Sequence, residues 1–271
     1  MARIASLFYY PVKGCAGTPV TSAEVTPAGL RHDRTFMAVG ADGSFRSQRR
    51  YPVMATIRPR ILDDGARLEL AAPGVETLVL DVRRDGPRHE GSTFTWQGKG
   101  VHQGPEAADW VSTVLGEPSV LVGVAPDHER VTAGLTPGTA VFADAHALLV
   151  TSESSLDALN ERIASAGGEP VPMARFRPNI VVSGWAEPHT EDRVRAMSAG
   201  SVGIGYAKDA VRCVVITIDQ ETGEKRGPEP TRTLAGYRRS PDGGVTFGMK
   251  GAVTRPGTLS VGDEITVADW A

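Results

Sequence analysis

The fold assignment depends on the segment Val211-Arg212-Cys213-Val214-Val215-Ile216-Thr217-Ile218-Asp219. Its many β-branched residues predict a buried strand over 211–218. Cys213 would stand at the leading end of that strand, beside an arginine. Because a cation stabilises a thiolate, such a cysteine could be a nucleophile or a ligand for a soft metal. A buried cysteine is more often a small hydrophobic residue, so both readings stay open.

Short strands separated by glycine and proline fill most of the remaining chain. In the N-terminal half we predict strands over 3–10, 35–39, 45–47, 66–71, 77–82, 93–96 and 100–102. Turn residues recur at a spacing of roughly 8–12 residues, which favours a barrel or a sandwich. In the second half the predicted strands are 147–150, 179–183, 201–206 and 264–267.

Two segments have the pattern of helices. Residues 105–115 begin with proline and are followed by Gly116, and residues 154–166 begin in a serine-rich cap. Residues 125–138 between them predict a polar loop or linker. Its Asp127-His128-Glu129-Arg130 run fits a solvated loop better than a metal cluster. We therefore predict an α+β chain, predominantly β, with an N-terminal β-barrel-like domain at 1–120 and a β-barrel domain with a few helices at 121–271.

Composition excludes several classes of protein. The chain has 271 residues, a formal net charge of −3 and a pI near 6.1. It therefore lacks the overall positive charge that favours binding to nucleic acid or to an anionic membrane. Two cysteines suffice for neither a disulfide framework nor a four-cysteine iron–sulfur site, and they suit a reducing cytosol. With no signal peptide or apolar span in the sequence, we expect a cytoplasmic protein without membrane or nucleic-acid partners.

Basic residues occur in short clusters. Arg175 and Arg177 would point the same way on an extended segment, where two guanidinium groups bind an anion such as phosphate or join a surface salt-bridge ladder. Lys13-Gly14 places a cation beside a flexible backbone. Further basic residues of the N-terminal half lie in Asp33-Arg34 and Arg49-Arg50. Together these segments suggest an anionic ligand, although each signal alone is weak.

Two polar features near the second helix remain ambiguous. Ser152, Ser154 and Ser155 could bind an anion at the helix N-terminus or could simply cap it. His146 could contact a ligand or could be a satisfied histidine of the core. The sequence contains no phosphate-loop or dinucleotide fingerprint.

Several motifs, in this order, resemble those of MOSC proteins, which are named after the C-terminal domain of molybdenum cofactor sulfurases. The N-terminal barrel of that family is matched by Tyr10-Pro11-Val12-Lys13-Gly14-Cys15, Gly29-Leu30, Asp33-Arg34 and Ser47-Gln48-Arg49. The MOSC domain is matched by Phe176-Arg177-Pro178-Asn179, Arg212-Cys213, Asp219-x-x-Thr222-Gly223 and Pro256-Gly257-Thr258-Leu259. The resemblance covers essentially the whole chain.

The resemblance implies a molybdenum cofactor, Mo-molybdopterin, with Cys213 as the metal ligand and catalytic residue. By position, the implied cofactor-binding residues are Lys13, Gly14, Arg34, His146, Arg177, Asn179, Arg212 and Lys250. The sequence departs from the mammalian members at Gly14 and Val211, where they have serines, and at Lys250, where they have a tyrosine. We therefore expect the cofactor contacts to differ in detail at these positions.

The activity implied by the resemblance is reduction of small N-hydroxylated (N–O) compounds, without pyridoxal phosphate. The electrons would come from an external protein, ferredoxin-like or cytochrome b5-like, with its reductase. Two alternatives remain. Cys213 could carry a persulfide in a sulfur-transfer protein, or the chain could bind the cofactor without catalysis.

Overall fold

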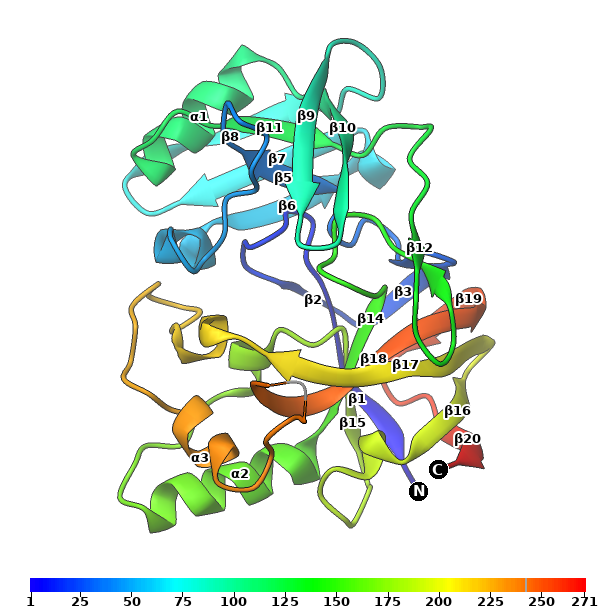
Figure 1. The fold of residues 1–271 in the computed structure, drawn as a ribbon. Helices are drawn as coiled ribbons and strands as arrows, with labels where there is room; N and C mark the ends of the chain where they lie inside the picture. Colours follow the sequence, from blue (N-terminus) through cyan, green and yellow to red (C-terminus); the bar gives the residue numbers. More distant parts are fainter. Residues whose placement is uncertain (242) are drawn as a thin grey trace.

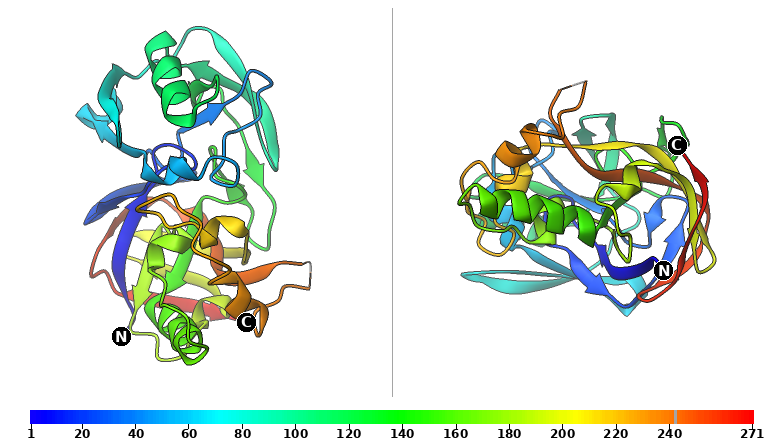
Figure 2. Two further views of the ribbon diagram at one scale, coloured as in Figure 1. Left: turned by 90° about the vertical axis from the view of Figure 1, so that its left-hand side faces the viewer. Right: turned by 90° about the horizontal axis from the view of Figure 1, so that it is seen from below.

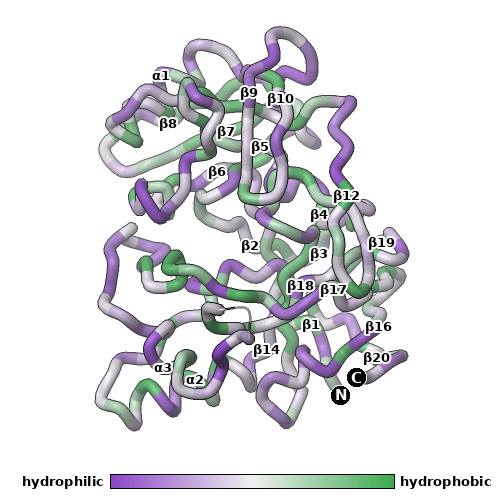
Figure 3. Tube along the Cα trace, in the orientation of Figure 1, coloured by the Kyte–Doolittle hydropathy of each residue, from purple (hydrophilic) through white to green (hydrophobic). Residues whose placement is uncertain are grey.

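The structure is a computed structural model that describes residues 1–241 and 243–271, and it is built mainly of strands (Figure 1). Figure 1 shows an upper and a lower lobe, with both chain termini in the lower one. Hydrophobic segments gather inside each lobe, and hydrophilic ones lie mostly in the outer loops (Figure 3). The predicted class, α+β and predominantly β with a β-barrel N-terminal part, is confirmed.

A curved eight-stranded sheet frames the lower lobe (Figure 2). The strand order is β2-β1-β15-β14-β18-β17-β16-β20, and β14–β15 is its parallel pair. β1 pairs antiparallel with β15, so the start of the chain lies among C-terminal strands. The bounds are β1 (Arg3–Tyr9), β2 (Thr18–Val20), β14 (Leu148–Ser152), β15 (Ile180–Ser183), β16 (Val194–Ala199), β17 (Val202–Arg212), β18 (Val245–Arg255) and β20 (Ile265–Trp270).

Two smaller sheets and one helix form the upper lobe. One sheet has the order β5-β11-β10-β9 and the other β6-β7-β8, and α1 packs its buried face against them. The bounds are β5 (Phe36–Val39), β6 (Arg58–Leu62), β7 (Arg67–Ala72), β8 (Val75–Asp81), β9 (Arg88–Thr93), β10 (Trp96–His102), β11 (Val120–Gly123) and α1 (Pro105–Leu115). The predicted helix over 105–115 is confirmed.

The remaining elements are short strands and two helices. The sheet β19-β3-β4 consists of β3 (Ser22–Thr26), β4 (Gly29–Leu30) and β19 (Gly257–Ser260), and β12 (Val131–Thr132) pairs with β13 (Gly138–Thr139). The helices are α2 (Glu153–Ser165) and α3 (Thr231–Ala235). Ser152 caps α2 by accepting a hydrogen bond from the backbone N–H of Ser155, so plain capping explains part of the serine cluster. The division into domains at residue 120 stays a prediction.

The predicted strand over 211–218 is wrong beyond Arg212. β17 ends there, and Cys213 is the N-cap of a 3-10 turn over Val214–Thr217. The turn buries Ile216 and leaves Val214 46% exposed. A run of β-branched residues indicates burial, and a short buried turn satisfies that composition as well as a strand does. Cys213 is therefore half-buried at the end of a strand.

The expectation that Arg175 and Arg177 share a face is also wrong. Met173–Phe176 forms a 3-10 turn, and Arg177 follows it in the left-handed region, with φ 56°. Pro178 disfavours the right-handed helical region for the residue before it, so the helix cannot continue through Arg177. Arg175 turns instead toward Asp219, 3.5 Å away.

Candidate functional site

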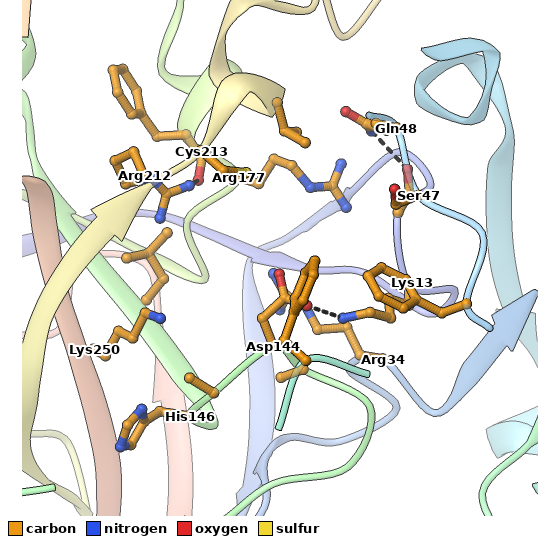
Figure 4. Close-up of a pocket in the computed structure, with 18 of the residues that line it drawn as sticks. Lys13, Arg34, Ser47, Gln48, Asp144, His146, Arg177, Arg212, Cys213 and Lys250 are labelled. Atoms are coloured by element: carbon orange, nitrogen blue, oxygen red, sulfur yellow. Dashed lines mark hydrogen bonds and ion pairs between the residues drawn. The ribbon is translucent and has the colours of Figure 1, made fainter. Parts of the chain in front are cut away.

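A pocket between the two lobes brings together every residue that the sequence analysis assigned to the site (Figure 4). Figure 4 shows Arg177 and Arg212 beside Cys213, with Lys13 and Arg34 on the facing side. The predicted site residues that line this pocket are Lys13, Gly14, Arg34, His146, Arg177, Asn179, Arg212, Cys213 and Lys250.

Cys213 and Arg212 form one wall of the pocket. β17 carries Arg212 to the pocket edge, where its guanidinium donates through Nη2 to the carbonyl oxygen of Phe176, 2.6 Å away. The Nε atom of Arg212 is buried and has no hydrogen-bond partner among the described residues. Burial lowers the pKa of Arg212, with the nearby Cys213 acting in the opposite direction. The wall thus presents a thiol beside a guanidinium with unused hydrogen-bonding capacity.

Lys13 lies in the facing wall and is almost fully buried. Its Nζ donates to the carbonyl oxygen of Phe142, 2.9 Å away, and forms an ion pair with Asp144. Burial alone would raise the pKa of Asp144, but the charge and hydrogen bond of Lys13 outweigh it and hold that pKa at about 2. Burial lowers the pKa of Lys13 against the pull of the carboxylate. The carboxylate therefore compensates the charge of Lys13.

Arg34 is fixed by an acid, an amide and an aromatic ring. Its Nη1 lies 2.5 Å from an oxygen of Asp33 and 3.3 Å from Oδ1 of Asn179. Its guanidinium carbon lies 4.4 Å from the centroid of the Tyr10 ring, within the range of a cation–π contact. Asn179 also accepts from the N–H of Leu149 and donates to a backbone carbonyl. Because its amide is committed to these partners, Asn179 positions Arg34.

Arg177 and Lys250 have no carboxylate partner among the described residues. Arg177 donates to Oε1 of Gln220, 3.0 Å away, and also lies 4.4 Å from the centre of the Tyr10 ring. Burial lowers the pKa of Arg177. Burial, with the nearby charge of Arg212 next in weight, lowers the pKa of Lys250 to about 8.

His146 and Gly14 complete the predicted set. Nε2 of His146 lies 2.8 Å from the carbonyl oxygen of Ala133, and its Nδ1 is buried without a partner in the described chain. Burial lowers the pKa of His146 to about 4, so the ring is neutral at pH 7, and Nδ1 is a free acceptor because Nε2 must donate to the carbonyl. Gly14 has a φ of +84°, which disfavours any side chain, and its carbonyl oxygen accepts from Nε2 of Gln48 at 2.7 Å.

Positive charge dominates the lining. Seven cationic side chains and one carboxylate, that of Asp144, line the pocket in the described structure. Three of the cations have acidic partners: Lys13, Arg34 and Arg46, which pair with Asp144, Asp33 and Glu117. No ion pair is found within the described residues for the other four: Arg49, Arg177, Arg212 and Lys250. Arg49 is exposed, but Arg177 is buried and Arg212 and Lys250 are partly buried. Burying uncompensated charge costs several kcal/mol per ion, so the pocket fits an anionic ligand.

The chain matches two adjoining family profiles. Residues 1–118 match the MOSC N-terminal beta barrel domain, and residues 137–266 match the MOSC domain. The chain belongs to the MOSC family.

Three curated relatives of this MOSC protein cover most of its length. Mitochondrial amidoxime reducing component 2 of Rattus norvegicus is 31% identical over 98% of this chain and 83% of the relative. Mitochondrial amidoxime-reducing component 1 of Homo sapiens is 29% identical over 98% of this chain and 82% of the relative. Molybdenum cofactor sulfurase of Oryza sativa subsp. japonica is 29% identical over 91% of this chain, which spans 32% of that longer relative.

Several residues around the pocket were not assigned to it from the sequence. Asp144 compensates Lys13, Tyr10 contacts two guanidinium groups, and Gln220 accepts from Arg177. Tyr10 lies within one of the motifs that resemble the family, so a signal for it existed. Gln220 stands at one of the two unspecified positions between Asp219 and Thr222 in the motif, so its contacts could be found only in the folded chain.

No described helix is both long enough and apolar enough to cross a membrane. The described residues also contain no group of three or more His, Cys, Asp or Glu side chains placed to hold a metal ion. The cytoplasmic location stays a prediction.

Proposed function

We propose that this MOSC protein binds a molybdenum–pterin cofactor in the pocket and reduces N-hydroxylated compounds. The observation that carries the proposal is the half-buried thiol of Cys213 beside cations that lack acidic partners. Such cations suit the phosphate of the cofactor, and a thiolate suits a soft metal. The names of the amidoxime-reducing relatives support the choice of substrate class.

Each wall of the pocket has its own role in this proposal. Cys213 would supply a thiolate ligand to the metal. Arg177, Arg212 and Lys250 attract the anionic part of the cofactor, while Lys13 and Arg34 are held in place by their acidic partners. When bound, the cofactor supplies the two-electron redox chemistry that breaks an N–O bond. The electrons come from a partner protein, ferredoxin-like or cytochrome b5-like, with its reductase.

Cofactor content and turnover test the proposal. We would purify wild type, Cys213→Ser and Cys15→Ser from a host that makes the cofactor and measure molybdenum and pterin per chain. Cys15 is the matched control because it is fully buried, and burial raises its pKa to about 12. We expect about one molybdenum per chain and reduction of an amidoxime in wild type and Cys15→Ser, and loss of both in Cys213→Ser. Equal molybdenum content in all three proteins would show that Cys213 is not a ligand of the metal.

A second candidate function is sulfur transfer through a persulfide on Cys213. The partly exposed thiol beside Arg212 suits attack on a sulfur donor, and one relative is named a molybdenum cofactor sulfurase. Cyanide-releasable sulfur on Cys213 in protein that contains no molybdenum would favour this function over reduction. Bound cofactor without turnover of any N–O compound would instead identify a non-catalytic binder.

A further inference from the structure

Neutral groups hold Arg177 in the pocket. Its Nη1 donates to Oε1 of Gln220, 3.0 Å away, and its guanidinium lies over the Tyr10 ring. Arg34 contacts the same ring but also has the carboxylate of Asp33. A carboxylate at the place of Gln220 could also accept from Arg177, but it would cancel the charge of the guanidinium. An amide oxygen holds the guanidinium and leaves the charge available to a ligand.

One orientation of the Gln220 amide satisfies all of its neighbours. Its Nε2 lies 3.0 Å from the carbonyl oxygen of Ile218 and 3.0 Å from Oε1 of Gln48, and two acceptors require an N–H donor at that end. Its Oε1 therefore faces two donors, Nη1 of Arg177 and Nε2 of Gln48. Gln220 is only 7% exposed, so water does not replace these partners.

Gln48 anchors this arrangement from another part of the chain. It is 1% exposed, and besides its two bonds with Gln220 its Nε2 donates to the carbonyl oxygen of Gly14, 2.7 Å away. A continuous hydrogen-bonded path thus runs from Gly14 through the two glutamines to Arg177. Residues far apart in the sequence thereby fix one guanidinium at the pocket wall.

The turn that carries Gln220 is also fixed. Oδ1 of Asp219 accepts from the backbone N–H groups of Glu221 and Thr222, at 2.9 and 3.1 Å. The backbone N–H of Asp219 also donates to the carbonyl oxygen of Glu224, 2.8 Å away. These contacts limit the freedom of the backbone on both sides of Gln220, so its amide oxygen has a defined place.

We propose that Gln220 is a positioning residue that aims Arg177 at an anionic ligand while leaving the charge of Arg177 uncompensated. The inference rests on the proposed function, in which that anion is the phosphate of the cofactor. Gln220 has no contact with the ligand in this proposal, and it acts through Arg177.

A double-mutant cycle tests the coupling between the two residues. We would measure binding of inorganic phosphate to the cofactor-free full chain by calorimetry at pH 7, in wild type, Gln220→Met, Arg177→Met and the double variant. We expect each single variant to bind phosphate at least about fivefold more weakly, and the double variant to bind no more weakly than Arg177→Met. The proposal would be overturned if the double variant bound phosphate more weakly than Arg177→Met by the factor that Gln220→Met alone loses. It would also be overturned if Gln220→Met bound phosphate with wild-type affinity. Gln103→Met is the control, because Gln103 is as deeply buried and bonds only to backbone away from the pocket.

A charge variant gives a second, independent readout. Gln220→Glu should bind phosphate about tenfold more weakly, because a carboxylate would neutralise Arg177. Thr222→Glu adds the same charge at an exposed position of the same turn and should bind phosphate like wild type. Wild-type affinity in Gln220→Glu would refute the proposal.

Cofactor content separates failure of this inference from failure of the proposed function. If wild type from a host that makes the cofactor carries neither pterin nor molybdenum, the proposed function fails, and the phosphate cycle still decides the role of Gln220. If wild type loads cofactor but Gln220→Glu and Gln220→Met load it equally well, the function stands and the inference fails.

Discussion

Replacing Arg130 with methionine should have two effects. It should lower the stability of the protein strongly, and it should weaken the binding of anions in the pocket. Arg130 is 7% exposed, and its guanidinium donates to the carbonyl oxygens of Val141, Ala143 and Asp144 and to Oγ1 of Thr95, at 2.8, 2.5, 3.0 and 2.7 Å. The bond to Ala143 is fully buried, and the other three are partly buried. The side chain therefore holds the pocket-lining loop 141–146 against the hairpin β9–β10.

The size of the effect follows from these four bonds. A buried hydrogen bond from a charged donor contributes about 1.5–3 kcal/mol, and we assign about 0.5–1 kcal/mol to each of the three partly solvated bonds. Arg130→Met should therefore lower the free energy of unfolding by about 3–6 kcal/mol, a large share of the typical total. The freed loop would also withdraw the carbonyl oxygen of Phe142 from Lys13, so the ammonium group of Lys13 would lose its fixed place in the pocket and phosphate binding would weaken.

Denaturant unfolding, followed by tryptophan fluorescence, measures the first effect, and calorimetric binding of inorganic phosphate measures the second. Arg58→Met is the matched control. Its ion pair with Glu221 joins two side chains that are 52% and 75% exposed, so we expect a loss of at most about 1 kcal/mol. A loss below about 1 kcal/mol in Arg130→Met, with unchanged phosphate binding, would refute the reasoning.

Three further predictions concern the core and the charges of the site. Phe247→Ala should cost about 3–5 kcal/mol in denaturant unfolding, since Phe247 is fully buried and stacks on Phe176 at 3.8 Å; a cost under about 1.5 kcal/mol would contradict this packing. The affinity of the cofactor-free protein for sulfate should fall as the pH rises through about 8, where Lys250 loses its charge. This fall should be absent in Lys250→Met. An identical pH profile in both proteins would show that Lys250 does not contribute to sulfate binding. Asp144→Asn should strengthen sulfate binding at pH 7 because it uncovers the charge of Lys13, at a cost of about 1 kcal/mol in stability after allowance for the 57% exposure of Asp144; weaker sulfate binding would refute this assignment.

The residues of the site could be identified from the sequence, but their local conformation could not. Cys213 and Arg177 both line the pocket, as the motifs indicated. The predicted strand over 211–218 runs past the observed end of β17 at Arg212, because hydrophobic composition indicates burial and leaves the backbone conformation open. Arg177 diverges from Arg175 because a 3-10 turn ends at Phe176 and a proline follows Arg177, so the proline is the local sequence signal for this bend.

Contacts between distant segments were the least predictable part of the site. The segment 125–138 has the composition of a polar linker, yet it contains Arg130, which is buried against backbone carbonyls. The pairing of Gln48 with Gln220 joins residues 172 positions apart. Neither contact follows from periodicity or from a local motif, because each depends on how the lobes come together.

The position of β1 in the large sheet has a consequence for the order of folding. Arg3 pairs with Ser183, so β1 can pair early with β2 but lacks β15 on its other side until the chain has grown past residue 183. At roughly 5–20 residues per second, that delay lasts on the order of ten to forty seconds. A fragment that begins at residue 121 would, for the same reason, leave an edge of β15 open to pairing with other chains. The two halves of the protein are thus better produced as one continuous chain than as separate pieces.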